Sequence, residues 1–161
     1  MSEVFISYVR EDEAVVRHIC RILTTNGIKV WLDKEQLEPG VRWKTSIENA
    51  IKRGLFFLSI HSRARQNRQE SHVHEELILA IEHFRKRSYG TTWLIPIKID
   101  DCEIENRPLG GGESILDLQW CDLRNWSNGI SRLLIAIGVK HPVVDFRKPL
   151  GSGPIDLAPS A

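Results

Sequence analysis

The feature of this sequence that most restricts its fold is a regular alternation of short apolar runs with longer, helix-like stretches. The short runs contain few polar residues, as strands buried on both faces of a parallel sheet do. We expect strands in residues 4–6, 28–32, 55–60, 93–99 and 115–118. Between them, apolar residues recur at the spacing of helices that bury one side. Strict alternation of this kind predicts an α/β fold, a doubly wound five-stranded parallel sheet with helices on both faces.

The predicted helices have recognisable ends. The first starts at Asp12 and stops at Asn26 and Gly27, a pair that commonly terminates a helix. Another starts at Ser71, a residue type that caps the free amides of a first turn. The last helix is expected over residues 126–137.

The segments that follow the strands form the predicted functional surface, because open parallel sheets bind ligands beyond the carboxyl ends of their strands. These segments are residues 7–12, 33–43, 61–71 and 99–113. The second of them is a long polar loop that contains Pro39 and Gly40, which makes it the first candidate functional segment.

Composition limits the function classes. With 161 residues, 42% hydrophobic and 27% charged, the chain fits one ordinary globular domain. Its apolar runs fall short of the roughly 18 residues of a membrane helix, and its first residues do not resemble a signal peptide, so we expect a cytoplasmic protein without membrane contact. A formal charge of +1 gives no reason to expect nucleic acid as a partner. Three widely spaced cysteines predict reduced, mostly buried thiols rather than a disulfide framework or a zinc site.

Two segments differ from the rest in composition. Arg63, Arg65 and Arg68 form a basic cluster on a predicted loop, and we expect these side chains to be solvated. From about His141 the helical and strand patterns stop, and prolines and glycines punctuate the chain. We therefore expect a domain at 1–140 and a linker or tail at 141–161, which either leads to a further domain, such as a sensor, or rests on the domain surface.

Three segments, each at an expected strand end, together resemble a TIR domain. They are VFISY at 4–8, VWLD at 30–33 followed by LEPG at 37–40 and Trp43, and SHVHEEL at 71–77. The resemblance covers about residues 2–138 and is closest to bacterial TIR domains and to NAD-cleaving animal TIR enzymes. It implies a flavodoxin-like sheet in which residues 33–43 form the so-called BB loop. It also implies one of two activities, since some TIR domains cleave NAD with a glutamate on the third helix and others act as assembly surfaces.

The resemblance places the catalytic glutamate at Glu76, four residues after a position where the family has tryptophan and this chain has His72. Glu75 is the adjacent competitor. On a helical projection Glu76 falls beside Val73 and Ala80, at the edge of the apolar stripe, and Glu75 falls on the far side. Geometry therefore favours Glu76. No further ligand cluster is apparent around it, so we expect no metal site.

NAD is expected as a substrate and not as a cofactor, since the chain has neither a G-x-G-x-x-G motif nor a Walker A motif. Arg10, after the first strand, is suited to phosphate, although it could equally be a solvated loop residue. Tyr8 and Trp43 are candidates for stacking on the bases, and Trp43 could instead cap the core. Lys34 and Ser46 are weaker candidates for contacts with the substrate.

The resulting hypothesis is an NAD+ glycohydrolase, or nucleosidase, that could also form cyclic ADP-ribose. The resemblance implies activation by self-association through TIR–TIR contacts, and bacterial antiviral defence as the setting. The alternative is a noncatalytic TIR scaffold for signalling assemblies, which the histidine at position 72 favours. A receiver domain with the same sheet is set aside, because His61 and Ser62 follow the third predicted strand where a receiver needs an aspartate.

Overall fold

The computed structural model describes residues 2–32, 45, 55–68, 77–78, 81–82, 93–110, 112–118 and 120–143. Within these residues the elements follow in the order β1 (Glu3–Ser7), η1 (Arg10–Asp12), α1 (Glu13–Thr25), β2 (Lys29–Leu32), β3 (Phe56–His61), α3 (Arg63–Gln66), β4 (Leu94–Lys98), β5 (Pro108–Gly110), β6 (Glu113–Ser114), η2 (Ile115–Asp117), β7 (Cys121–Asp122) and α5 (Trp126–Ile137).

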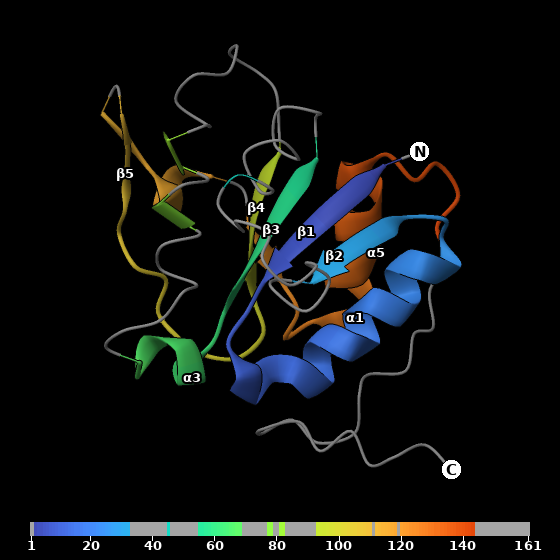
Figure 1. Ribbon diagram of the computed structural model, residues 1–161, viewed down its shortest axis with the longest axis horizontal. Coiled ribbons are helices and arrows are strands. Elements are labelled where there is room, and N and C mark those ends of the chain that lie inside the picture. Colours follow the sequence, from blue (N-terminus) through green and yellow to red (C-terminus); the bar gives the residue numbers. More distant parts are fainter. Residues whose placement is uncertain are drawn as a thin grey trace.

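Five of the strands form one parallel sheet in the spatial order β2-β1-β3-β4-β7 (Figure 1). The first strand of the chain lies inside this sheet, with Val4 opposite Val30 of β2 on one side and Phe56 of β3 on the other. This strand order is that of a flavodoxin-like α/β fold, which confirms the predicted fold class.

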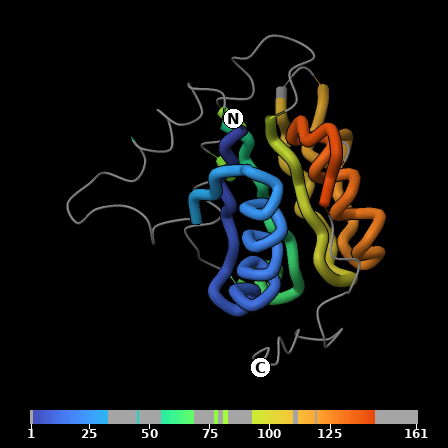
Figure 2. Tube along the Cα trace, turned by 90° about the vertical axis from the view of Figure 1, so that its right-hand side faces the viewer, coloured from blue at the N-terminus to red at the C-terminus, as the bar shows by residue number. Residues whose placement is uncertain are grey.

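Helices α1 and α5 cover the same face of the sheet (Figures 1 and 2). Successive side chains of a strand point to opposite faces, so alternate residues of the strands face these helices. The largest buried cluster lies here and joins strand residues such as Ile6 and Leu58 to Ile19 of α1 and Leu134 of α5. The apolar stripes predicted for the first and last helices are therefore the surfaces that cover the sheet.

The opposite face has a second buried cluster. Phe5 and Phe57 stack there with ring centroids 5.4 Å apart. Leu77 and Ile81 pack against them and are one helical turn apart, whereas Ile78 between them is 44% exposed. This pattern confirms the predicted apolar stripe at these two positions and shows that helical residues cover both faces of the sheet (Figure 1).

The ends of α1 and α5 follow the sequence signals. Helix α1 stops at Asn26, whose amide donates to the carbonyl oxygen of Ile22, and Gly27 follows at φ +80°. Helix α5 spans the residues expected for it and stops at Gly138, at φ +104°. A left-handed residue after the last turn is the usual end of a helix, and glycine adopts it without a steric penalty.

The fifth strand of the main sheet is not where the sequence predicted it. The strand is β7, at Cys121–Asp122, and the expected strand at 115–118 is instead the short helix η2. Ser114 caps η2 by accepting from the amide of Leu116, and the carboxylate of Asp117 accepts from the amide of Ser114 at 2.7 Å. Ile115 is buried in the cluster on the face opposite α1 and α5, so its apolar side chain fills the core although it does not belong to a strand.

A small antiparallel hairpin follows β4 in the chain. Strands β5 and β6 form this hairpin outside the main sheet, and Gly112 between them adopts φ +82°. The hairpin lies on the side of the sheet opposite α1 (Figure 1).

At the amino ends of the strands, the chain after α5 is tied back to α1. The side chain of Asn26 accepts from the amide of Val143 and donates to its carbonyl oxygen, both at 2.8 Å. Ser2 donates to the carbonyl oxygen of Ile137 at 3.0 Å. Of the predicted tail, Val143 thus contacts the domain, and the residues after it lie outside the described residues.

Candidate functional site

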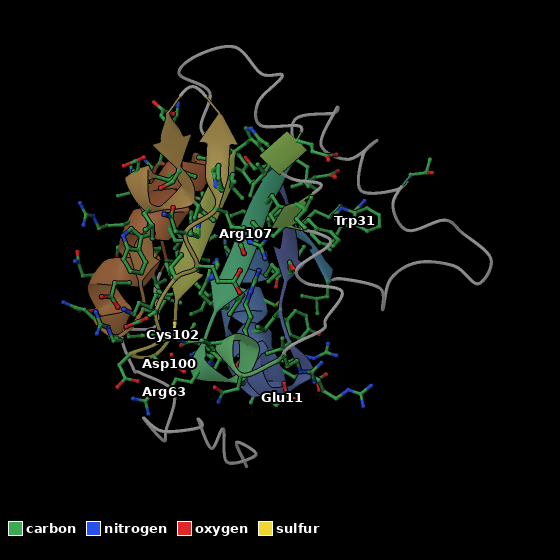
Figure 3. The ribbon with its side chains drawn as sticks, turned by 90° about the vertical axis from the view of Figure 1, so that its left-hand side faces the viewer. Glu11, Trp31, Arg63, Asp100, Cys102 and Arg107 are labelled. Atoms are coloured by element: carbon green, nitrogen blue, oxygen red, sulfur yellow. The ribbon has the colours of Figure 1, made fainter. Side chains whose placement is uncertain are left out.

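The first residues of three of the four predicted functional segments, 7–12, 61–68 and 99–102, meet at the carboxyl ends of β1, β3 and β4. Figure 3 shows Glu11, Arg63, Asp100 and Cys102 from these segments at this end of the sheet, far from Trp31 on β2. The fourth segment, 33–43, lies outside the described residues. We call this region the carboxyl edge.

The turn η1 follows β1 and decides which side chains of this segment face outward. Residues three apart lie on the same side of a 3-10 turn. Val9 and Asp12 are both buried, whereas Arg10 and Glu11 between them are exposed. The amide of Asp12 donates to the carbonyl oxygen of Val9 at 2.9 Å and closes the turn. The turn therefore presents Arg10 to solvent and directs Asp12 inward.

Asp12 is bound by Ser62, the residue that follows β3. The Ser62 hydroxyl donates to Oδ2 of Asp12 and accepts from the amide of Arg65 at 3.1 Å, so that it also caps α3. Arg65 is 2% exposed, and its Nη1 donates to Oγ of Ser59 at 3.1 Å and to the carbonyl oxygen of Ile60 at 3.0 Å. We call Asp12, Ser62 and Arg65 the interlock, because they join the turn after β1 to the helix after β3.

A buried histidine extends this polar layer into the sheet. His61 is 2% exposed, and its Nε2 lies 3.0 Å from Oγ of Ser59. Since Arg65 can only donate to Ser59, the hydroxyl hydrogen is free to reach the histidine ring. The end of β3 thus contains buried polar groups that bind one another beside the apolar core.

The segment after β4 binds the start of α3. Both carboxylate oxygens of Asp100 accept from the amide of Arg63, at 3.2 and 3.0 Å, and one of them also accepts from the amide of Cys102 at 2.9 Å. The Arg63 guanidinium pairs with Asp101 at 2.5 Å on the surface. Burial raises the pKa of the Cys102 thiol to about 12, so the thiol is neutral and is not a nucleophile near pH 7.

A surface ion pair joins the segment after β1 to the segment after β3. Nη2 of Arg68 lies 2.5 Å from Oε1 of Glu11, and this hydrogen bond lowers the pKa of Glu11. Within the described ranges, no carboxylate is paired with the neighbouring Arg10. Of the two exposed residues of η1, Glu11 is thus paired, and Arg10 has no carboxylate partner among the residues that the structure describes.

Asp12 is an acid at the carboxyl edge whose pKa is shifted toward neutral pH. Burial raises the pKa of Asp12 to about 6, although the hydrogen bond from Ser62 opposes the rise. The negative charges of Asp100 and Glu11 add to the rise, and the positive charge of Arg65 opposes it. A carboxyl group that titrates near neutral pH in such a position is a functional candidate.

The structure describes only two of the site residues predicted from the sequence, Tyr8 and Arg10. Arg10 is exposed at the carboxyl edge, and its contact with phosphate stays a prediction. Tyr8 is 7% exposed and belongs to the core below α1 and α5, and its stacking on a base stays a prediction. Five predicted site residues lie outside the described residues, and their roles stay predictions: Lys34, Trp43, Ser46, His72 and Glu76.

Two features of the carboxyl edge were not predicted from the sequence: the interlock and the burial of one of the three arginines. Arg63 and Arg68 are exposed, but Arg65 was expected to be solvated and is buried. The physical reason is that α3 turns Arg65 back onto Ser59 and the carbonyl oxygen of Ile60, which accept two hydrogen bonds from Nη1 in place of water. A serine after an apolar strand run is a sequence signal for the cap, but nothing in the sequence points to its partner Asp12.

A groove of about 450 Å³ lies between β7 and α5, at the far edge of the sheet. It is lined by Ile95, Trp120, Cys121, Asp122, Asn125, Asn128, Gly129, Arg132, Leu133 and Ala136. The acid that lines this groove, Asp122, pairs with Arg124, which donates to both carboxylate oxygens and lowers the pKa of that group. The carboxyl edge, with its buried acid and exposed arginine, is therefore the stronger candidate site.

Comparison with protein-family models matches residues 4–134 of the chain to the TIR domain. The match covers most of the sequence and agrees with the strand order of the sheet, and the chain therefore belongs to the TIR-domain family. Membership supports a function of this family, either signalling or NAD+ cleavage, and TIR domains commonly self-associate. Comparison with curated proteins gives no match.

Two features are absent from the residues that the structure describes. In that part of the chain, no helix combines the length and apolar character needed to cross a membrane. Over the same residues, no group of three or more His, Cys, Asp or Glu side chains is arranged to hold a metal ion.

Proposed function

We propose that the chain is an NAD+ glycohydrolase that cleaves the bond between nicotinamide and ribose, with Glu76 as the carboxylate beside the reacting sugar. Membership of the TIR family supports this activity or a signalling role. The observation that favours cleavage is the exposed, unneutralised Arg10 guanidinium at the carboxyl edge, among the residues that the structure describes. Its planar set of donors matches the oxygens of a diphosphate.

The chemistry needs one well-placed carboxylate. Breaking the nicotinamide–ribose bond builds positive charge on the sugar, as in the oxocarbenium-like transition state of glycosidases. A nearby anion stabilises that charge. Nicotinamide is bound as a cation and leaves as a neutral molecule, so its departure requires no general acid. Attack by water then gives ADP-ribose, and attack by the adenine ring gives cyclic ADP-ribose.

The anchoring of the neighbouring residue supports Glu76 in this role. Leu77 is helical and fully buried, and it packs in the cluster that contains Phe5 and Phe57. A catalytic group must be held in place by packed residues around it, and an anchored leucine next to the glutamate meets that need. Lys34, Trp43, Ser46 and His72 remain the proposed contacts for the rest of the substrate, outside the described residues.

We further propose that TIR–TIR self-association raises the activity, and that NAD+ depletion in the bacterial cytoplasm, as an antiviral response, is its setting. The family supports self-association in general.

The first prediction is that Glu76→Ala abolishes nicotinamide release. The variant loses the anion at the reacting sugar, and we expect a loss of at least about 100-fold in kcat, as for other removals of transition-state charge stabilisation. Purified protein is incubated with NAD+ in solution and at high density on a resin, which promotes contacts between copies. Nicotinamide is measured by chromatography.

Glu75→Ala is the matched control, because it removes the adjacent carboxylate and should retain activity. Equal release by wild type and Glu76→Ala overturns the assignment of Glu76. No release by wild type in either format favours the noncatalytic scaffold, which predicts that replacement of Pro39 or Gly40 weakens self-association.

A further inference from the structure

The interlock connects two segments that are far apart in the sequence. Asp12 belongs to the turn that carries Arg10, and Ser62 belongs to the segment that leads from β3 into α3. The Ser62 hydroxyl donates to Asp12 and accepts from Arg65, so it has one defined orientation. A shift of either segment breaks this pair of hydrogen bonds.

Asp12 also fixes the rotation of η1. Because Val9 and Asp12 are buried together, Arg10 must lie on the outer side of the turn. Glu11 is held by Arg68, so the second exposed side chain of the turn is fixed as well. The direction of the Arg10 guanidinium thus depends on the inward anchor at Asp12.

We propose that Asp12 is a positioning residue for NAD+ binding: through its hydrogen bond from Ser62, it holds η1 so that Arg10 faces the diphosphate of the ligand. This inference rests on the proposed function. It assigns no contact between Asp12 and NAD+, since the Asp12 carboxylate is buried and acts through the turn that it anchors.

Because Asp12 is a titratable group, its positioning role should make the binding of NAD+ depend on pH, which a purely structural role would not. Asp12 faces Glu11 from its own turn, Arg65 from α3, and Asp100 and the Cys102 thiol from the segment after β4. Since burial raises the pKa of Asp12 to about 6, lowering the pH from 7.5 to 5 protonates its carboxylate. The neutral acid is favoured by burial, but it accepts a weaker hydrogen bond from Ser62 and is no longer attracted to Arg65. Affinity for the diphosphate should therefore weaken over this range.

The test measures KM and kcat for NAD+ from pH 5 to pH 7.5 on the full chain, with Asp12→Asn and Ser62→Ala. Asp12→Asn mimics the protonated acid, so its KM at pH 7.5 should equal that of wild type at pH 5, about tenfold above the wild-type value at pH 7.5. Its KM should also vary less with pH than that of wild type, because the variant lacks the titrating carboxyl group, and its kcat should be nearly unchanged. Ser62→Ala should raise KM to a similar extent, and Ser62→Thr should restore it.

Ser114→Ala is the matched control. Ser114 also caps a short helix, accepting from the amide of Leu116 at 3.2 Å, but it lies away from the carboxyl edge. Its substitution should leave KM unchanged at every pH, which separates loss of a cap from loss of the anchor.

The outcomes distinguish this inference from the proposed function. NAD+ cleavage that depends on Glu76, with a wild-type KM in both Asp12→Asn and Ser62→Ala, overturns the inference alone. A KM increase in Asp12→Asn that still varies with pH as in wild type also overturns it. Neither cleavage nor binding of NAD+ by wild type removes the proposed function and this inference together.

Discussion

The two ends of the sheet are held together by different kinds of interaction. At the carboxyl edge, buried charged groups of the interlock connect the segments after β1 and β3. At the amino end, neutral hydrogen bonds connect Asn26 with Val143 and Ser2 with Ile137. The first set contains an acid with a pKa of about 6, whereas none of the groups in the second set titrates near neutral pH.

The difference predicts that interactions at the carboxyl edge change with pH and that the neutral hydrogen bonds at the amino end do not. Buried charges add little net stability when paired, but they are costly when one partner is removed, and their state follows pH. Neutral bonds from a side chain to the backbone contribute modestly and do not follow pH. Proposed ligand binding and the buried acid thus occur together at the carboxyl edge, whereas the hydrogen bonds named at the amino end contain no titratable group.

The largest effect should come from Arg65→Met at the carboxyl edge. The substitution keeps an unbranched apolar side chain but removes the donors to Ser59 and to the carbonyl oxygen of Ile60, and leaves Asp12 without a buried positive neighbour. We expect a loss of about 4 kcal/mol in the free energy of unfolding at pH 7, measured by urea denaturation.

Arg63→Met is the control for this prediction. Arg63 and its partner Asp101 are 65% and 59% exposed, so their ion pair should contribute less than about 0.5 kcal/mol. Similar losses for the two variants would show that the burial of Arg65 carries no special energetic weight.

The next effect is the pH dependence of stability caused by Asp12. The pKa of Asp12 is raised from 3.8 to about 6 in the folded state, so the folded protein holds this proton more tightly than the unfolded chain. The contribution of Asp12 to stability is therefore fully present below the unfolded pKa and is lost as pH rises through the folded pKa, by about 3 kcal/mol in total. Asp12→Asn should remove this decline.

Urea midpoints of wild type and Asp12→Asn from pH 4 to pH 8 test this prediction. The comparison between the two proteins is needed because other acids act in the opposite direction. Arg68 lowers the pKa of Glu11, and Arg124 lowers that of Asp122. The stability that these two acids contribute is lost as the pH falls. A difference between the two proteins that is constant with pH contradicts a raised pKa for Asp12.

The sequence predicted the elements that periodicity determines and missed those that distant partners determine. Helix α5 has the predicted bounds, because an apolar stripe ends there at a glycine. Strand β7 has two residues, too few for any periodic pattern, and the apolar run before it is used by Ile115 to fill the core. Burial of Arg65 depends on a serine and a strand carbonyl presented by the fold, which composition does not reveal.

The same distinction applies to the candidate site. The rule that ligands bind beyond the carboxyl ends of parallel strands placed Arg10 correctly at that edge. Asp12 was interpreted only as the start of a helix, since its role depends on Ser62, which lies 50 residues away in the sequence. Local pattern identifies an exposed candidate, whereas the group that holds it in place depends on tertiary contact.

The smallest effect should come from Asn26→Ala at the amino end. The variant loses both hydrogen bonds to the backbone of Val143, together with the bond from its side chain to the carbonyl oxygen of Ile22. These bonds are neutral and partly exposed, so we expect a loss of about 1 kcal/mol that is the same at pH 5 and at pH 8. Amide exchange at Val143 should also accelerate, because its donor loses its acceptor.

Thr25→Ala is the control, because the Thr25 hydroxyl donates only within α1, to the carbonyl oxygen of Arg21 at 2.8 Å. It should leave exchange at Val143 unchanged. If the effect of Asn26→Ala instead grows or shrinks between pH 5 and pH 8, the amino end also contains a titrating group, and the contrast between a responsive and a constant end of the sheet fails. A constant effect, set beside the pH-dependent effect of Asp12→Asn, locates the response to pH at the edge where Arg10 is exposed.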